Sequence, residues 1–152
     1  MTLREPMSVD SVLVPVDGTE ESTTAVEYAV AVADRYDASV HVLFVLGHGV
    51  LTGIDAGTVE SDEVASYSRE FLDEAAGIAD GAGVPISTST AHGFTPSRKT
   101  VHPGSVVLDT AEELAADFIV VPRESVQDSS AEVLEQVAEY VLSYASQPVL
   151  SV

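Results

Sequence analysis

The residue with the clearest capacity for chemistry is Asp17, which ends the stretch S-V-L-V-P-V-D and precedes Gly18. The apolar run Val12 to Val16 is short and rich in β-branched residues, which predicts a strand buried on both faces. Thr19 to Ser22 then supply capping and acidic residues for a helix with apolar positions at helical spacing. This strand, turn and helix place Asp17 at the carboxyl end of a central parallel strand, where open α/β folds bind ligands.

A histidine, His41, lies inside the second predicted strand, Ser39 to Leu46. A histidine in that setting is typical of a hydrogen-bonded structural residue, and no partner stands at metal-site spacing from it. The sequence places no nucleophile beside a base, no carboxylate pair and no metal-ligand cluster at usable spacing. We therefore expect neither enzymatic activity nor a metal site.

A basic loop, His92 to His102, is the most unusual segment, since it holds Arg98 and Lys99 side by side and contains no acid. Two interpretations stay open. The loop binds an anion or an acidic partner, or it is a surface insertion held by ion pairs to nearby acidic helices.

Five predicted strands alternate with four predicted helices along the chain. We expect Gly81 and Gly83 to end the second helix, and Leu114 of the third helix to face the core. The expected helices span 19–36, 61–80, 105–116 and 129–145. The expected strands are 12–16, which Asp17 and Gly18 end, and then 39–46, 85–91, 117–121 and 149–152. Right-handed crossovers turn this order into a single α/β domain over residues 1–152: a Rossmann-like, doubly wound, five-stranded parallel sheet with four helices, the first strand central.

The charge balance is strongly acidic, with 25 acidic and 6 basic residues and a net charge of −19. Such a chain repels nucleic acid and anionic membranes, so we expect neither as a partner. We interpret the acidic surface as adaptation to high salt in a halophile, because salt screens self-repulsion. No apolar run is long enough to span a bilayer and no apolar signal core precedes Asp10, which predicts a cytoplasmic protein.

Three segments resemble the universal stress protein (UspA-like) family: the strand and turn ending at Asp17, the segment A-E-E-L-A-A-D-F-I-V-V, and the segment V-A-E-Y-V-L-S-Y-A-S-Q-P-V-L-S-V. The resemblance spans nearly the whole chain and is most specific in its last third. It implies a Rossmann-like domain and a homodimer, which in this chain would pair along Val149 to Val152. It also implies that some members bind ATP and others do not.

Members that bind ATP resemble one another in two places. The first is the end of the opening strand and a position along the adenine, matched here by Pro15, Val16, Asp17 and Val45. The second is a phosphate motif after the fourth strand, G-x-x-G followed nine residues later by G-[ST], whose backbone N–H groups approach the phosphates.

This chain departs from the phosphate motif at every position, where it has Pro122, Ser125, Glu135 and Gln136. Proline removes an N–H, and a glutamate would place a carboxylate near a phosphate. We therefore expect Asp17 to hold the turn or cap the helix in preference to contacting a ribose.

The function expected from these features is that of a dimeric, non-enzymatic stress-response or regulatory protein that binds no ATP and acts through an unidentified protein partner. The alternative is an adenine-nucleotide-binding stress protein, taking ATP or AMP through Asp17 and a rebuilt phosphate loop to which Arg98 and Lys99 contribute.

Overall fold

The computed structural model describes residues 8–45, 61–91, 103–122 and 132–152. Strands and helices alternate over these residues as the sequence predicts. In chain order they are β1 (Ser11–Val16), α1 (Glu20–Tyr36), β2 (Ser39–Val45), α3 (Ser61–Ala82), β3 (Ile86–Ala91), α4 (Pro103–Glu113), β4 (Phe118–Val121), α5 (Glu132–Tyr144) and β5 (Val149–Ser151).

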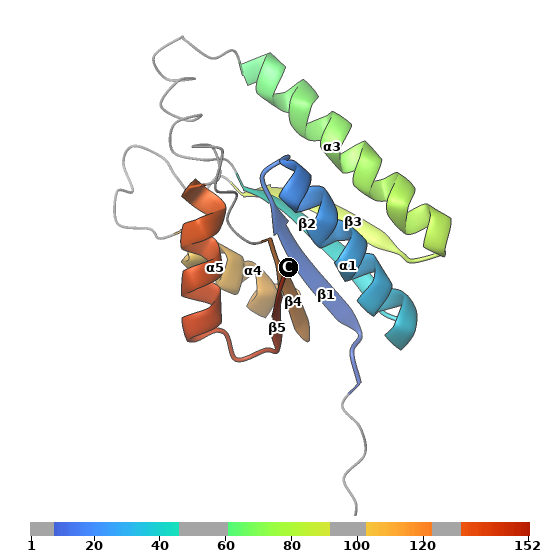
Figure 1. The fold of residues 1–152 in the computed structure, drawn as a ribbon, viewed down its shortest axis with the longest axis vertical. Helices are drawn as coiled ribbons and strands as arrows, with labels where there is room; N and C mark the ends of the chain where they lie inside the picture. Colours follow the sequence, from blue (N-terminus) through green and yellow to red (C-terminus); the bar gives the residue numbers. More distant parts are fainter. Residues whose placement is uncertain (1–7, 46–60, 92–102, 123–131) are drawn as a thin grey trace, which may run out of the picture.

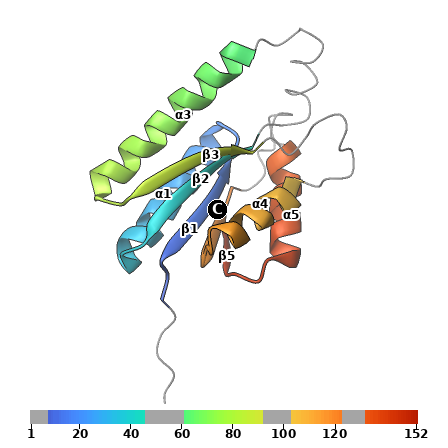
Figure 2. The same ribbon diagram turned by 180° about the vertical axis from the view of Figure 1, so that it is seen from behind.

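The five strands form one parallel sheet in the order β3-β2-β1-β4-β5. β1 is central, and the chain reverses direction across the sheet between β1 and β4. The predicted fold class and the central position of β1 are therefore confirmed. Helices α1 and α3 cover one face of the sheet and α4 and α5 cover the other, as both views show (Figure 1 and Figure 2).

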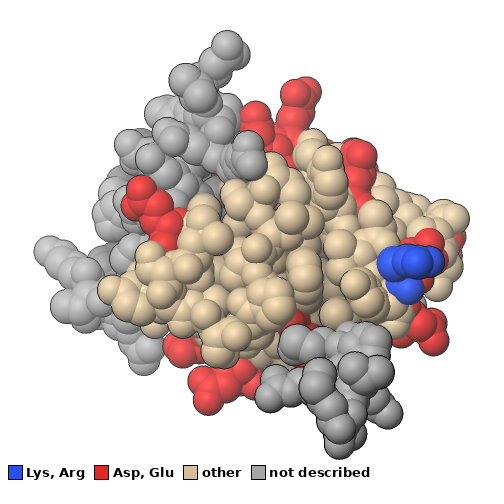
Figure 3. All heavy atoms as spheres, turned by 60° about the horizontal axis from the view of Figure 1, so that its bottom comes forward, with Lys and Arg blue, Asp and Glu red and all other residues tan. Residues whose placement is uncertain are grey.

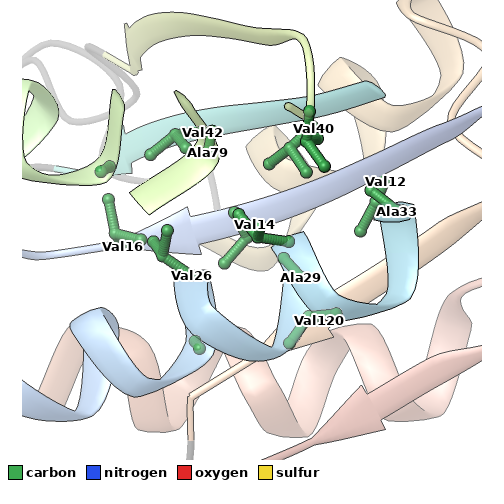
Figure 4. Packing of buried hydrophobic residues seen from close by; sticks show 14 of the residues in the cluster. Val12, Val14, Val16, Val26, Ala29, Ala33, Val40, Val42, Ala79 and Val120 are labelled. Carbon is green, nitrogen blue, oxygen red and sulfur yellow. The ribbon is translucent and has the colours of Figure 1, made fainter. Parts of the chain in front are cut away.

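The larger core lies between the sheet and the helices α1 and α3. Alternate residues of the central strands point into it, among them Val14 of β1 and Val42 of β2, both fully buried. Small residues of α1, such as Ala29, let the helix approach the sheet closely (Figure 4). Each fully buried valine contributes about 1.5–3 kcal/mol relative to exposure, so this cluster fixes the strand that carries Asp17.

The smaller core lies on the opposite face, under α4 and α5. Leu13 of β1 and Ile119 of β4 point into it and meet Val107 of α4. The two helices pack tightly at Gly104, where an added Cβ would lie 2.4 Å from the Cβ of Tyr140. Both faces of β1 are thus buried, which explains its continuous apolar run.

Three helices end in the same way, with a residue of positive φ followed by a backbone hydrogen bond back into the helix. The residues are Asp37 (φ 56°), Gly83 (φ 69°) and Ala115 (φ 51°). In each case the next N–H donates to the carbonyl five residues earlier: Ala38 to Ala33 at 2.8 Å, Val84 to Ala79 at 2.9 Å and Ala116 to Ala111 at 2.8 Å. This is the Schellman arrangement, and it turns each helix directly into the following strand.

Two predictions about helix ends were wrong. Gly81 does not stop α3 but lies inside it, because the positive φ that ends the helix falls at Gly83. Leu114 does not face the core but is 41% exposed, because α4 ends at Glu113 and the chain turns at Ala115. α4 also begins two residues earlier than predicted, at Pro103, since proline is well suited to a first helical turn.

Acidic side chains are spread around the rim of the face seen in Figure 3, and basic side chains are sparse on it. The helices that the structure describes include none with the length and apolar character needed to cross a membrane.

Candidate functional site

The turn between β1 and α1 carries the candidate site. Thr19 is the N-cap of α1, with extended backbone angles, and its Oγ1 accepts a hydrogen bond from the Ser22 N–H at 3.3 Å. The first turn of the helix then carries Glu20 and Glu21, which suit the positive end of the helix dipole. Thr19, and not Asp17, is therefore the N-cap of α1.

One carboxylate oxygen of Asp17, Oδ1, collects three donors. The Thr19 N–H donates to it at 3.1 Å, the Thr19 hydroxyl at 2.7 Å and the Ser22 hydroxyl at 2.8 Å. The Asp17 N–H donates in turn to Ser22 Oγ at 2.9 Å. Ser22 is fully buried, so this network fixes the turn, which is the structural role expected for Asp17.

The other carboxylate oxygen, Asp17 Oδ2, is buried and has no hydrogen-bond partner among the residues that the structure describes. A buried acceptor without a donor is costly, and native proteins seldom leave one unused. A ligand that offers an N–H or O–H group would satisfy it. The two oxygens of the Asp17 carboxylate thus differ in their hydrogen bonding. Oδ1 stabilises the turn by accepting three hydrogen bonds, and Oδ2 can accept one from a ligand.

The turn is held from the side of α3 by Tyr67. Its hydroxyl donates to the Gly18 carbonyl at 2.8 Å. Gly18 has φ +90°, and a Cβ there would lie 2.6 Å from a carbon of the Tyr67 ring. Glycine is therefore required next to Asp17 for both its backbone angle and its missing side chain.

The remaining predicted site residues divide between the two faces of the sheet. Pro15 is buried at the end of β1, and strand alternation places its side chain on the face to which Val45 also belongs. Val16 packs instead into the core beneath α1 and α3. The structure therefore groups Pro15 and Val45 on the α4 and α5 side of the sheet near Asp17, and Val16 contributes no side chain to that group.

The predicted phosphate positions are described in part. Pro122 directly follows β4, is buried, and offers no N–H. Ser125 lies outside the described residues, as does the basic loop His92 to His102 with its possible anion contacts. Glu135 and Gln136 lie within α5, and the positions of their side chains are outside the description.

A second polar cluster, which the sequence did not predict, surrounds His41. Its Nδ1 lies 2.7 Å from Ser87 Oγ and its Nε2 lies 2.7 Å from Ser89 Oγ. Burial lowers the pKa of His41 below its ordinary value. His41 is hydrogen-bonded, as expected, but pairing with two serines could be found only from the register of β2 against β3. Within the described part of the chain, no cluster of His, Asp and Glu side chains could hold a metal ion.

The universal stress protein family model matches residues 8–152 of this chain. The chain therefore belongs to the universal stress protein family. The match covers every described element, from β1 to β5.

Universal stress protein MJ0531 of Methanocaldococcus jannaschii is 28% identical over 144 residues, which cover 93% of this chain and 80% of that protein. Among solved structures, the hypothetical protein MJ0577 has a TM-score of 0.76 at 16% identity, over 96% of both chains. A universal stress protein from Archaeoglobus fulgidus in complex with dAMP has a TM-score of 0.63 at 22% identity, over 95% of this chain and 98% of that one. These structures establish the fold.

Proposed function

We propose that this universal stress protein is a non-enzymatic stress-response or regulatory protein of the cytoplasm that binds no ATP and acts as a dimer on a protein partner. The observation that carries the proposal is Pro122, buried at the end of β4 where the family resemblance places a glycine of the phosphate motif. A phosphate held there needs a backbone N–H, and proline has none.

Charge supports the same conclusion. The net charge of −19 opposes the approach of a triphosphate, and Glu135 replaces a small residue at another position of the motif. A carboxylate about 4 Å from a phosphate costs on the order of 1 kcal/mol or more, depending on exposure.

A second candidate function is the binding of an adenine nucleoside or monophosphate such as AMP. The buried and unpartnered Oδ2 of Asp17 favours it, because an amino or hydroxyl group of a nucleoside would donate to that oxygen. Pro15 and Val45 would contact the apolar base, and Arg98 and Lys99 would supply the phosphate contacts that the changed motif lacks. A relative whose structure contains dAMP supports this candidate.

Titration calorimetry in molar KCl separates the two candidates. We expect no heat of binding from ATP with Mg²⁺ at micromolar protein, and ATP binding with a micromolar Kd would overturn the main proposal. Binding of adenosine or AMP that Asp17→Ala abolishes would establish the second candidate. If the double variant Arg98→Ala, Lys99→Ala binds AMP with unchanged affinity, the basic loop does not contribute to the nucleotide site.

The proposed dimer forms by pairing of β5 with β5 of a second copy, through the segment Val149 to Val152. β5 lies at an edge of the sheet with β4 as its one neighbour, and its residues are half-buried. The Val152 N–H donates to Val121 of β4 at 3.0 Å. By alternation the Ser151 N–H points to the free edge, where a second strand would accept from it.

Sedimentation velocity of matched Ser151 variants tests the dimer. Ser151→Pro removes the outward N–H and leaves the hydrogen bonds to β4 in place. We therefore expect this variant to be a folded monomer with a cooperative melting transition. Ser151→Ala keeps the N–H and should remain a dimer. A monomeric parent protein, or a dimer that survives Ser151→Pro, would contradict this interface.

The acidic surface supports adaptation to the high salt of a halophile. Screening over about 3 Å at 1 M salt removes most of the self-repulsion of the folded state. We expect the Tm to rise steadily from low to molar KCl, whereas equal Tm values would count against a halophilic origin.

A further inference from the structure

The cluster around His41 lies outside the Asp17 turn and is built by strand register. His41 of β2 pairs with Ser87 of β3, and Leu43 pairs with Ser89 two residues further on. Because alternate residues of a strand share a face, both serines stand on the same side of β3. Each ring nitrogen of His41 is 2.7 Å from one serine oxygen, so the imidazole is held in a single orientation.

The two hydrogen bonds must differ in direction when the imidazole is neutral. A neutral imidazole carries one N–H and one lone pair, so one serine accepts from the ring and the other donates to it. With the proton on Nδ1, His41 donates to Ser87 Oγ and accepts from the Ser89 hydroxyl. This order of hydroxyl, base and orienting group is the arrangement that activates a serine nucleophile.

The base and the hydroxyl groups also differ in exposure. His41 is 9% exposed, whereas Ser87 is exposed and Ser89 is half-buried. β3 lies at an edge of the sheet. The imidazole is therefore shielded from water while a reagent reaches the serines. Leu43, the cross-strand neighbour of Ser89, is buried in the smaller core, so the neighbour of Ser89 on β2 is apolar.

We propose that Ser89 is a nucleophile activated by His41 and that it takes a small acyl group from an activated ester. Ser89 Oγ forms a bond to the acyl carbon, and the bond from that carbon to the leaving oxygen breaks. The hydroxyl proton passes to His41 Nε2 and then to the leaving oxygen, so no oxidant or reductant is needed. Ser87 positions the ring by accepting the Nδ1 proton in a hydrogen bond. This site is independent of nucleotide binding and goes beyond the proposed function.

The test uses the full chain and p-nitrophenyl acetate as the acyl donor. Released p-nitrophenolate is followed by absorbance, and the acetylated residue is located by peptide mass spectrometry. The chain suits this reagent because it has a single lysine, Lys99, and no cysteine, which keeps unrelated acylation low. We expect one acetyl group per chain, on Ser89.

The variants separate activation from simple exposure. Ser89→Ala and His41→Gln should lower the rate of release by about 10-fold or more, since a positioned base contributes at least that much. Ser87→Ala should lower the rate by a smaller factor and leave Ser89 as the labelled residue. Ser66→Ala, at an exposed serine of α3, serves as the matched control and should leave the rate unchanged.

Four results would overturn the proposal: no acetylserine in the parent protein, acetylation at Ser87 instead of Ser89, an unchanged rate in Ser89→Ala, or an unchanged rate in a folded His41→Gln. If His41→Gln fails to fold, as its melting curve would show, Ser89→Ala and the peptide map decide the matter alone.

Discussion

An aspartate carboxylate lies at each end of the central strand β1, and the two are used differently: Asp17 directly follows β1, and Asp117, which directly precedes β4, lies beside the start of β1. At the amino end, Asp117 Oδ2 accepts from the Asp10 N–H at 2.8 Å and the Ser11 N–H at 3.1 Å. At the carboxyl end, Asp17 Oδ1 takes three donors, while Oδ2 is buried and takes none from the described part of the chain. Fixing the backbone accounts for Asp117 Oδ2 and for Asp17 Oδ1. The carboxyl end differs because Asp17 Oδ2 is buried and takes no donor among the described residues, and this is the oxygen to which the nucleoside of the second candidate function would donate.

The largest effect is expected at the carboxyl end. Asp17→Ala removes an acceptor from three donors, and Ser22 among them is fully buried, so we expect the free energy of unfolding to fall by roughly 3 kcal/mol. Asp17→Asn keeps one oxygen for those donors and should cost roughly 1 to 2 kcal/mol. Urea denaturation in molar KCl measures both. Equal losses in the two variants would show that Oδ1 does not organise the turn.

At the amino end the expected effect is smaller. Asp117→Ala leaves the Asp10 and Ser11 N–H groups without their acceptor, but these lie in an exposed to half-buried region that water can reach. We expect a loss of about 1 kcal/mol by the same denaturation measurement. A loss as large as that of Asp17→Ala would break the distinction between the two ends.

Two helix-ending residues with positive φ, Ala115 and Gly83, are expected to change stability in opposite directions when each is replaced. Ala115, near the amino end of the sheet, has φ 51° and an ordinary side chain. Ala115→Gly should therefore raise the free energy of unfolding by about 1 kcal/mol, because glycine carries no Cβ penalty there. Gly83→Ala is the matched control: it ends α3 in the same conformation with open space around it, and it should lose a similar amount. A Tm that falls in Ala115→Gly would contradict this account of the helix ends.

The smallest effect concerns pH and His41, which lies between the two ends of the sheet. Burial lowers the pKa of His41 in the folded protein, so the unfolded chain binds the proton first as the pH falls. The stability linked to His41 is complete above about pH 6.5 and declines as the pH falls through that value toward the lower folded pKa.

The difference between the parent protein and His41→Gln isolates this contribution from that of the carboxylates. We expect the parent to lose more stability than His41→Gln between about pH 8 and about pH 5, as measured by urea denaturation. A parallel decline in the two proteins would show that folding does not lower the pKa of His41.

The sequence predicted the sheet because β1, β2 and β4 are buried on both faces and read as continuous apolar runs. It placed Asp17 at the carboxyl end of β1 for the same reason. The sequence could not predict that only one oxygen of the Asp17 carboxylate accepts hydrogen bonds within the turn, since that depends on the positions of Thr19 and Ser22 after the turn has folded. The pairing of His41 with Ser87 and Ser89 was missed as well, because it rests on the register between two strands and joins residues 46 and 48 positions apart in the chain. Helix ends were misplaced where a residue other than the expected one takes positive φ, as Ala115 does.

Native mass spectrometry of the protein purified from cell extract, with no nucleotide added, tests whether this chain binds ATP. We expect a mass free of ATP, because Pro122 offers no N–H to a phosphate and the net charge of −19 repels the triphosphate. A copurified AMP or adenosine that is lost in Asp17→Ala would fit the second candidate function. A mass increase equal to ATP, retained through desalting, would contradict the account.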